Sequence, residues 1–179
     1  MKNNKIFFII LIMISTRVFC ASQHLNIWTA QGYLFYYPNT LMVVNDEKAK
    51  NCIKLHLKNS NGILLSDNFE LKICTHYDEL SIVIKNSVFQ EKQGKWIASG
   101  SMDQQPARRV RLSNGNIFIE TAILPSCGIT DSEAVFHAAG GQCYSAVISN
   151  KKITVTIDSD GVNTDFGLMK IISHSIFLK

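Results

Sequence analysis

The chain has 179 residues, of which 46% are hydrophobic and 18% are charged, and its formal net charge is +4. This length suits one domain of ordinary size, and the balance of apolar and charged residues excludes a disordered chain. The same composition excludes a collagen, a coiled coil and a polytopic membrane protein.

The first twenty residues have the layout of a secretory signal peptide. Lys2 and Lys5 precede an uninterrupted apolar run over residues 6–14, and a more polar segment of small residues follows. Nine apolar residues are too few to span a bilayer, which takes roughly 20. We therefore expect residues 1–20 to be removed, without a transmembrane anchor. A lipoprotein signal acylated on Cys20 is the alternative, although Phe19 is larger than the residue expected before such a cysteine.

Loss of this segment changes the charge balance of the protein. It removes three of the 18 basic residues and none of the 14 acidic ones, which leaves a net charge of about +1 for residues 21–179. Bulk charge then gives no reason to expect nucleic-acid binding. A nearly neutral, bacterial, periplasmic or secreted domain favours another protein or a small ligand as its partner.

Short strands separated by turn residues are expected through the N-terminal half. Residues 52–58 alternate between apolar and polar side chains, and residues 69–74 repeat that alternation, which is typical of strands with one buried face. Further strands are expected at 33–37, 41–44, 80–84 and 96–98, with 88–89 as a partner for 80–84.

Two hairpins and one helix are expected in the C-terminal half. The hairpins cover residues 109–120, around Asn114-Gly115, and residues 146–157. Residues 168–172 and 175–178 are expected to close the sheet. A capping-box pattern at 130–133, followed by an apolar run and Gly140-Gly141, predicts a short helix over 130–139. The sequence thus predicts a mainly β, single-domain antiparallel sandwich or barrel with one short helix.

Four cysteines remain once Cys20 is set aside, and an even number in an exported chain indicates two disulfides. Three connectivities are open from the count alone. If 52–58 and 69–74 fold back on each other about residue 63, Cys52 lies opposite Cys74, and Cys127 would pair with Cys143. There is no Cys-x-x-Cys motif or Cys/His cluster with zinc spacing, so we expect no metal and no cofactor.

No motif predicts catalysis. The sequence lacks a nucleophile elbow, a His-Glu-x-x-His helix, a Walker loop and a dinucleotide-binding glycine pattern. A Ser-x-x-Lys match at 149–152 falls on an expected turn, and the acidic turn at 158–161 lacks the spacing of a calcium loop. We therefore expect a protein that is not an enzyme and has no catalytic, cofactor-binding or metal-binding residues.

Two groups of side chains are candidates for an interface. Trp28, Tyr33 and Tyr36 belong to an aromatic segment near the N-terminus of the exported part, and Arg109 and Arg111 share one face of a predicted strand. Tyr, Trp and Arg are common anchors of protein interfaces.

The sequence therefore favours an exported, non-enzymatic domain that binds another protein. Inhibitors or immunity proteins against toxic hydrolases, and subunits of surface structures, belong to this class. One alternative is a small secreted hydrolase or nuclease using Asp131, Glu133 or His137. Another is a lipocalin-like barrel that encloses a small ligand.

Overall fold

The computed structural model describes residues 25–30, 32–58, 64–99, 104–124, 128–130, 136–138, 143–159 and 165–179. The predicted signal peptide lies outside these residues. The described elements, in chain order, are β1 Leu25–Ala30, β2 Tyr33–Pro38, β3 Leu41–Asn45, β4 Cys52–Lys58, β5 Leu64–His76, α2 Leu80–Lys85, β6 Phe89–Lys92, β7 Lys95–Ser99, β8 Gln104–Pro106, β9 Arg108–Arg111, β10 Ile117–Leu124, β11 Gly128–Thr130, β12 Phe136–Ala138, β13 Cys143–Ser149, β14 Thr154–Ser159, α3 Phe166–His174 and β15 Phe177–Leu178.

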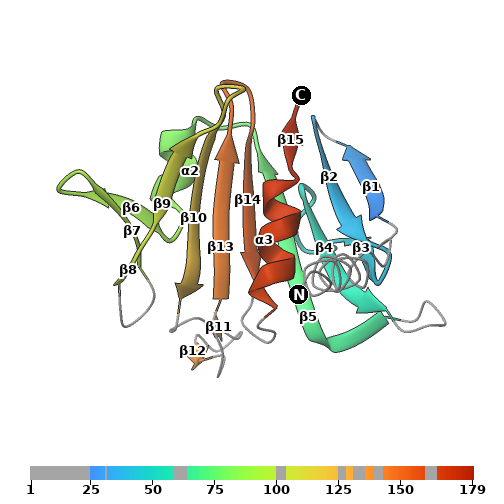
Figure 1. Cartoon of the computed structure of the whole chain (residues 1–179). Helices are drawn as coiled ribbons and strands as arrows, with labels where there is room; N and C mark the ends of the chain where they lie inside the picture. The colour runs from blue at the N-terminus through green and yellow to red at the C-terminus, as the bar shows by residue number, and fades with distance from the viewer. Residues whose placement is uncertain are drawn as a thin grey trace, which may run out of the picture.

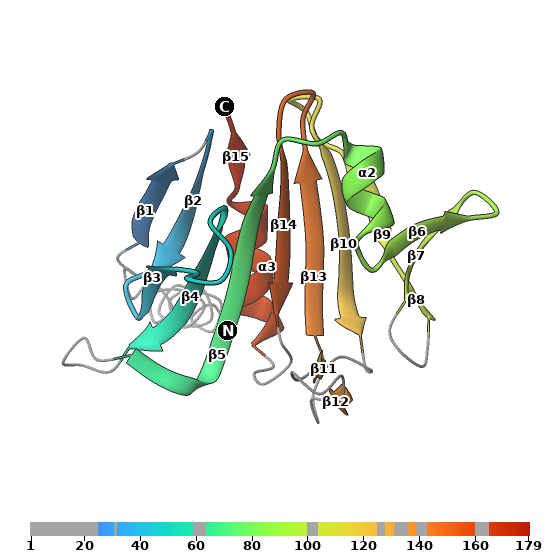
Figure 2. The same cartoon turned by 180° about the vertical axis from the view of Figure 1, so that it is seen from behind.

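A seven-stranded sheet in the order β3-β4-β5-β14-β13-β10-β9 is the centre of the fold, and all of its pairings are antiparallel. A small sheet, β1-β2-β15, lies together with α3 over one face, and α2 and the sheet β6-β7-β8 lie on the other side (Figures 1 and 2). The mainly β, antiparallel, sandwich-like architecture is thus confirmed. The barrel alternative is wrong, because β3 and β9 are the two ends of an open sheet among the described strands.

The main core fills the space between the large sheet and the layer made of the small sheet and α3. Ile53, Ile73 and Ile157 stand in register across three neighbouring strands and are buried. Phe35 from β2 and Met169 from α3 belong to the same cluster, and both are fully buried. Burial of this apolar surface is the main force that holds the two layers together.

A second, smaller core lies on the opposite face of the large sheet. Phe89 and Ala98 of the β6-β7-β8 sheet pack against Ile119 and Val147 of the large sheet. This cluster fixes the position of α2, whose partly buried Leu80 also packs against it.

The predicted return of the chain between β4 and β5 is confirmed. Cys52 is the register partner of Cys74, and the two form a disulfide with a Cα–Cα distance of 4.1 Å. The described residues show one such bridge, not the two that the sequence predicts. Cys143 is disulfide-bonded, but Cys127 lies outside the described residues, so the Cys127–Cys143 pairing stays a prediction.

Both predicted hairpins are present as β9–β10 and β13–β14. Gly115 in the first turn has φ +85°, a left-handed conformation that glycine adopts without strain. In the second turn, the Asn150 side-chain oxygen accepts hydrogen bonds from the backbone N–H groups of Lys152 and Ile153, at 2.7 and 2.8 Å. This is the turn chemistry for which asparagine is favoured.

Two predicted strands are helices. Residues 80–84 belong to α2, where Val83 is buried and Leu80 and Ile84 pack against the smaller core, although β-branched residues favour strands. Residues 168–172 belong to α3, whose buried Met169, Ile172 and Ser173 follow helical spacing. The Asp165 side chain caps this helix by accepting from the Leu168 N–H at 2.9 Å.

The predicted helix over 130–139 is wrong. Residues 136–138 form β12, which pairs with β11 at 128–130, and residues 131–135 lie outside the described part. An isolated helix of this length is marginal even with a capping box, and Ile129, Thr130 and Phe136 are residue types that favour strands.

Candidate functional site

Exposed apolar side chains gather on the outside of the small sheet. Along β2, Tyr33 and Phe35 point into the core, whereas Leu34 and Tyr36 point outward. The pairing places Ile27 opposite Tyr36, and Phe177 opposite Leu34. The relative exposures are 51% for Leu25, 59% for Ile27, 41% for Tyr36 and 51% for Phe177. We call Leu25, Ile27, Leu34, Tyr36 and Phe177 the outer apolar face.

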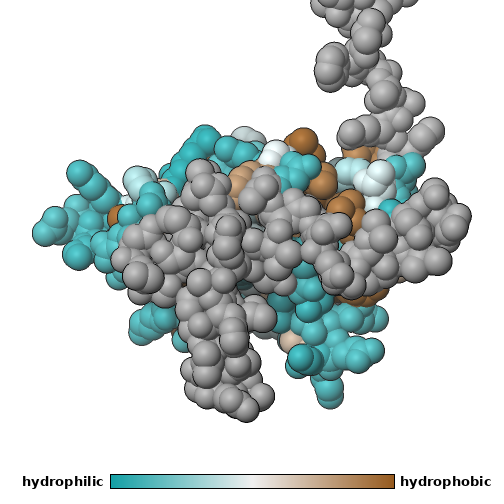
Figure 3. Space-filling view, turned by 90° about the horizontal axis from the view of Figure 1, so that it is seen from below, coloured by the Kyte–Doolittle hydropathy of each residue, from teal (hydrophilic) through white to brown (hydrophobic). Residues whose placement is uncertain are grey.

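The surface of α3 continues this face. A depression lined in part by Tyr36, Phe177, His174 and Ser175 joins the two, and the Tyr36 N–H donates a hydrogen bond to Ser175 Oγ at 2.9 Å. Ile171 on α3 is also exposed. Seen from below, apolar residues gather near the middle of the upper edge of the molecule, whereas the projecting β6–β7 hairpin at the left is mostly hydrophilic (Figure 3).

The five predicted interface residues do not form one surface. Tyr36 lies on the outer apolar face, but Tyr33 belongs to the core, where burial raises the pKa of its phenol to about 12. Trp28 is half-buried, with its ring 5.2 Å from that of Tyr33. Arg109 and Arg111 are exposed at the far end of the large sheet, where the Arg109 guanidinium lies 5.6 Å from the Trp96 ring centroid.

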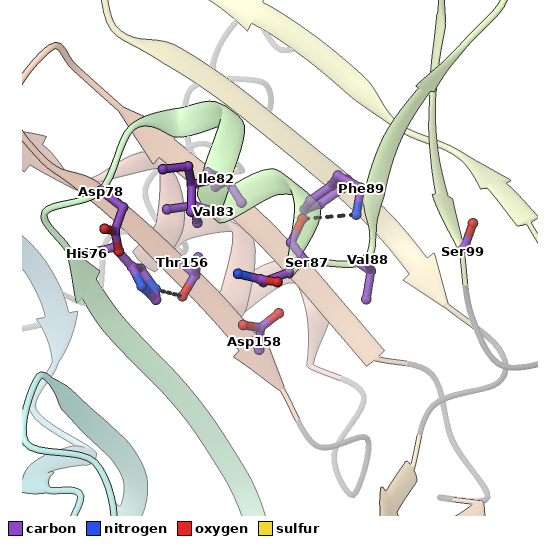
Figure 4. Close-up of a pocket in the computed structure, with 12 residues that line it drawn as sticks. His76, Asp78, Ile82, Val83, Ser87, Val88, Phe89, Ser99, Thr156 and Asp158 are labelled. Atoms are coloured by element: carbon purple, nitrogen blue, oxygen red, sulfur yellow. Dashed lines mark hydrogen bonds between the residues drawn. The ribbon is translucent and has the colours of Figure 1, made fainter.

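A pocket of about 530 Å³ lies between α2 and the large sheet (Figure 4). His76 of β5 and Thr156 of β14 form part of its wall, with His76 Nε2 at 3.0 Å from Thr156 Oγ1. Asp158 is accessible from the pocket, and its Oδ1 accepts a hydrogen bond from Ser145 Oγ at 2.8 Å. The remaining lining combines polar groups with apolar ones, namely Asp78, Ile82, Val83, Asn86, Ser87, Val88, Phe89, Ser99 and Val147.

Two groups in this pocket have shifted pKa values. Burial lowers the pKa of His76, and the Asp78 carboxylate opposes that shift only in part. Asp158 is exposed toward the pocket, and partial desolvation by the surrounding protein raises the pKa of its carboxyl, while the Ser145 hydroxyl and nearby Lys72 oppose the shift. Perturbed groups in a concave site are typical of binding or catalysis. Within the described ranges, no three His, Cys, Asp or Glu side chains could hold a metal ion together.

The raised pKa of Asp158 predicts a pH-dependent gain in stability on its removal. Because the folded-state pKa lies above the unfolded value, stability falls as pH rises through the range between them. Asp158→Asn keeps an acceptor for Ser145 but carries no charge. We expect this variant to unfold at a higher temperature than wild type at pH 7 and at the same temperature at pH 3. Glu91→Gln, on the projecting hairpin, is the control, and a difference independent of pH would contradict the prediction.

A buried carboxylate marks a third feature, beside α3. The Glu120 side chain is 5% exposed, and its Oε2 lies 3.0 Å from His174 Nε2 and accepts from the Tyr144 hydroxyl at 3.3 Å. Its Oε1 lies 3.8 Å from Arg108 Nη1 and 3.9 Å from Lys170 Nζ. Burial raises the pKa of Tyr144, so this phenol stays protonated as a donor. We call these five side chains the Glu120 cluster.

Sequence reasoning missed the Glu120 cluster. The one local signal is that Glu120 shares a strand face with Phe118, at a position where alternation calls for an apolar residue. The hydrolase candidates of the sequence have no described geometry: residues 131 and 133 lie outside the described ranges, and His137 is placed in β12 by its backbone alone. Neither α2 nor α3, the helices of the described part, is long and apolar enough to cross a membrane.

Similarity to known proteins is found in the fold and not in the sequence. No family model and no curated protein matches the sequence. The architecture is PsbP-like. It is similar to the solution structure of cyanobacterial PsbP (CyanoP) from Synechocystis sp. PCC 6803, with a TM-score of 0.51, 14% identity, and coverage of 87% of this chain and 92% of that one. At this identity the likeness shows the fold alone.

A second similar structure comes from Bacteroides thetaiotaomicron VPI-5482. Its TM-score is 0.43 at 6% identity, and the match covers 86% of this chain and 48% of that chain. This likeness is too distant to carry an argument about the site.

Proposed function

We propose that this chain is an exported, non-enzymatic domain that acts by binding another protein through the outer apolar face and the adjoining surface of α3. The observation that carries the proposal is the clustering of exposed apolar side chains. Of the seven large apolar side chains that are exposed in the described part of the chain, five lie on this side, namely Leu25, Ile27, Tyr36, Ile171 and Phe177. Contiguous exposed apolar surface on a monomer typically marks an interaction site.

Export is supported by the disulfide between Cys52 and Cys74, because such bridges persist in oxidising compartments. The signal-like first twenty residues agree with it. We place the protein in the periplasm or outside the cell. The fold that this chain shares with CyanoP is compatible with a role without catalysis.

The surface fits a partner that brings an apolar strand or helix face. β1 is an end strand of the small sheet with no neighbour on its other side among the described strands, so its backbone can also pair with an incoming strand. The proposal covers inhibitors and immunity proteins of toxic hydrolases, and subunits of surface structures.

Site-specific photo-crosslinking in the producing organism tests the proposal. We expect a photoreactive residue at position 27 to capture a different protein as a discrete product, because Ile27 is the most exposed side chain of the outer apolar face and lies opposite Tyr36. The control position is 82, where an apolar side chain is exposed on α2 instead. Crosslinks at 82 but not at 27 would contradict the proposal, and so would a product at 27 that contains only a second copy of this chain.

A second candidate function, hydrolysis in the pocket of Figure 4, is favoured by the contact between His76 Nε2 and Thr156 Oγ1. A hydroxyl on an imidazole nitrogen is an arrangement that can activate a nucleophile. Purified protein is therefore assayed with nitrophenyl esters and phosphodiesters. We expect no turnover above buffer, whereas turnover that disappears in Thr156→Val would favour this second candidate over the first.

A further inference from the structure

The Glu120 cluster has more positive than negative charge. Arg108 reaches Glu120 from β9 and Lys170 reaches it from α3, and each approaches the same carboxylate oxygen at nearly 4 Å. Their side chains are 65% and 48% exposed, so both cations remain open to solvent beside a carboxylate that is almost fully buried. One carboxylate facing two permanent cations leaves a positively charged rim.

The cavity beside this rim combines an apolar lining with a few polar groups. It has a volume of about 180 Å³, and Val110, Leu112, Phe118 and Ile148 form its apolar lining. Glu120 and Ser173 supply polar groups at positions that are themselves buried. An apolar protein cavity of roughly 150 Å³ is large enough to admit benzene. The space therefore suits one phenyl ring or one branched alkyl group.

We propose that this pocket binds a carboxylate joined to an apolar group of that size. The apolar group occupies the cavity, and the carboxylate lies against Arg108 and Lys170 at the rim. Such a group can come from a free small acid or from the end of a partner chain that carries an apolar last residue.

The geometry favours an anion over a cation. The Oε2 atom of Glu120 is engaged by His174 and Tyr144, and a cationic ligand would have to displace Arg108 and Lys170 from Oε1. An incoming carboxylate instead gives the two partly exposed cations a second partner, and charge-assisted pairing with arginine is among the stronger polar contacts in proteins. In this arrangement Glu120 is a positioning residue that holds the cations beside the cavity.

The pocket adjoins the surface proposed for the protein partner. Leu112 and His174 line both this cavity and the depression beside Tyr36 and Phe177. A partner seated on the outer apolar face can therefore reach the cavity. The inference adds a ligand class to the proposed function, but its first test needs no partner.

The probe is 4-methylpentanoate, compared with its neutral amide, in a ¹H–¹⁵N NMR titration of the intact folded protein. We expect saturable shifts at the amides of Phe118, Ile148 and His174 with the acid, and at least tenfold weaker binding of the amide. In Arg108→Gln/Lys170→Gln, affinity for the acid falls at least tenfold, whereas Arg111→Gln/Lys95→Gln, which removes two exposed charges elsewhere, leaves it unchanged. The hydrogen bonds of Glu120 to His174 and Tyr144 remain in the first variant, so it should stay folded.

Equal binding of acid and amide, equal losses in the two double variants, or no saturable shift with the acid would each overturn the inference. A short peptide ending in leucine, with a free or an amidated C-terminus, distinguishes the two sources. If the free-ended peptide binds more tightly than 4-methylpentanoate, the ligand is a chain end; if it binds more weakly, the ligand is a small acid. If the wild-type protein does not bind the acid but still gives the crosslinked product at position 27, this inference is overturned and the proposed function is not.

Discussion

Replacing Phe35 with alanine is expected to lower the free energy of unfolding by about 3–5 kcal/mol, the usual cost of removing a buried aromatic ring. Phe35 is fully buried between the small sheet and the large one. Its ring centroid lies 5.5 Å from that of Trp28 and 5.7 Å from that of Tyr37. The truncation would leave a cavity among these aromatic rings. Urea denaturation followed by Trp fluorescence measures the loss.

The neighbouring residue supplies the matched control. Tyr36 is on the outer apolar face, so Tyr36→Ala should change the free energy of unfolding by less than about 1 kcal/mol, as is usual for surface substitutions. It should weaken partner binding instead. Similar losses of stability in Phe35→Ala and Tyr36→Ala would contradict the assignment of the two faces of β2.

Removing the Cys52–Cys74 disulfide is expected to cost about 3 kcal/mol on the chain-entropy model of a closed loop of this size. The two cysteines are 22 residues apart in the sequence, and the bridge limits the unfolded chain more than the folded sheet. The double variant Cys52→Ala/Cys74→Ala is measured by urea denaturation under oxidising conditions. It isolates this bridge, whereas a reducing agent would also act on the disulfide of Cys143.

The difference in the free energy of unfolding between wild-type protein and the double variant should shrink once both proteins are fully reduced. A denaturation midpoint for the double variant equal to that of oxidised wild type would contradict the prediction. The prediction would also be contradicted if the double variant were destabilised only after the disulfide of Cys143 is reduced.

The strands were predictable where alternation and turn chemistry agree. Residues 52–58 and the hairpins around Gly115 and Asn150 combine a period of two with residues that suit their turns, and each of these elements is confirmed. The Cys52–Cys74 register followed from the same pattern. Local sequence is enough here because each of these pairings joins strands that follow one another directly in the chain.

The helices were not predictable in the same way. Residues 80–84 are a short apolar run, and periodicity cannot distinguish a short strand from a short buried helix. In α3 the useful signal was Asp165, which caps the helix, together with the spacing of Met169 and Ile172. The segment at 130–139 had a capping box, but β12 pairs with β11 instead. Tertiary contacts decided these segments against local preference.

The candidate site was predictable only in part. Tyr36 was recognised as an interface candidate, because an apolar strand on both faces suggests one face for the core and one for a partner. Ile27 and Phe177 were not, since the outer apolar face joins residues from opposite ends of the chain. The Glu120 cluster likewise collects side chains from β9, β10, β13 and α3. No spacing in the sequence predicts that they meet.

The most direct test of partner binding compares two double variants against the protein captured by crosslinking at position 27. Ile27→Ser/Phe177→Ser removes two side chains of the outer apolar face, and Tyr77→Ser/Ile82→Ser removes two exposed apolar side chains elsewhere. If the first pair includes a hot spot of about 2 kcal/mol or more, the Kd measured by titration calorimetry rises roughly 30-fold or more. The second pair should leave the Kd unchanged. Equal Kd values for wild type and Ile27→Ser/Phe177→Ser would contradict the account.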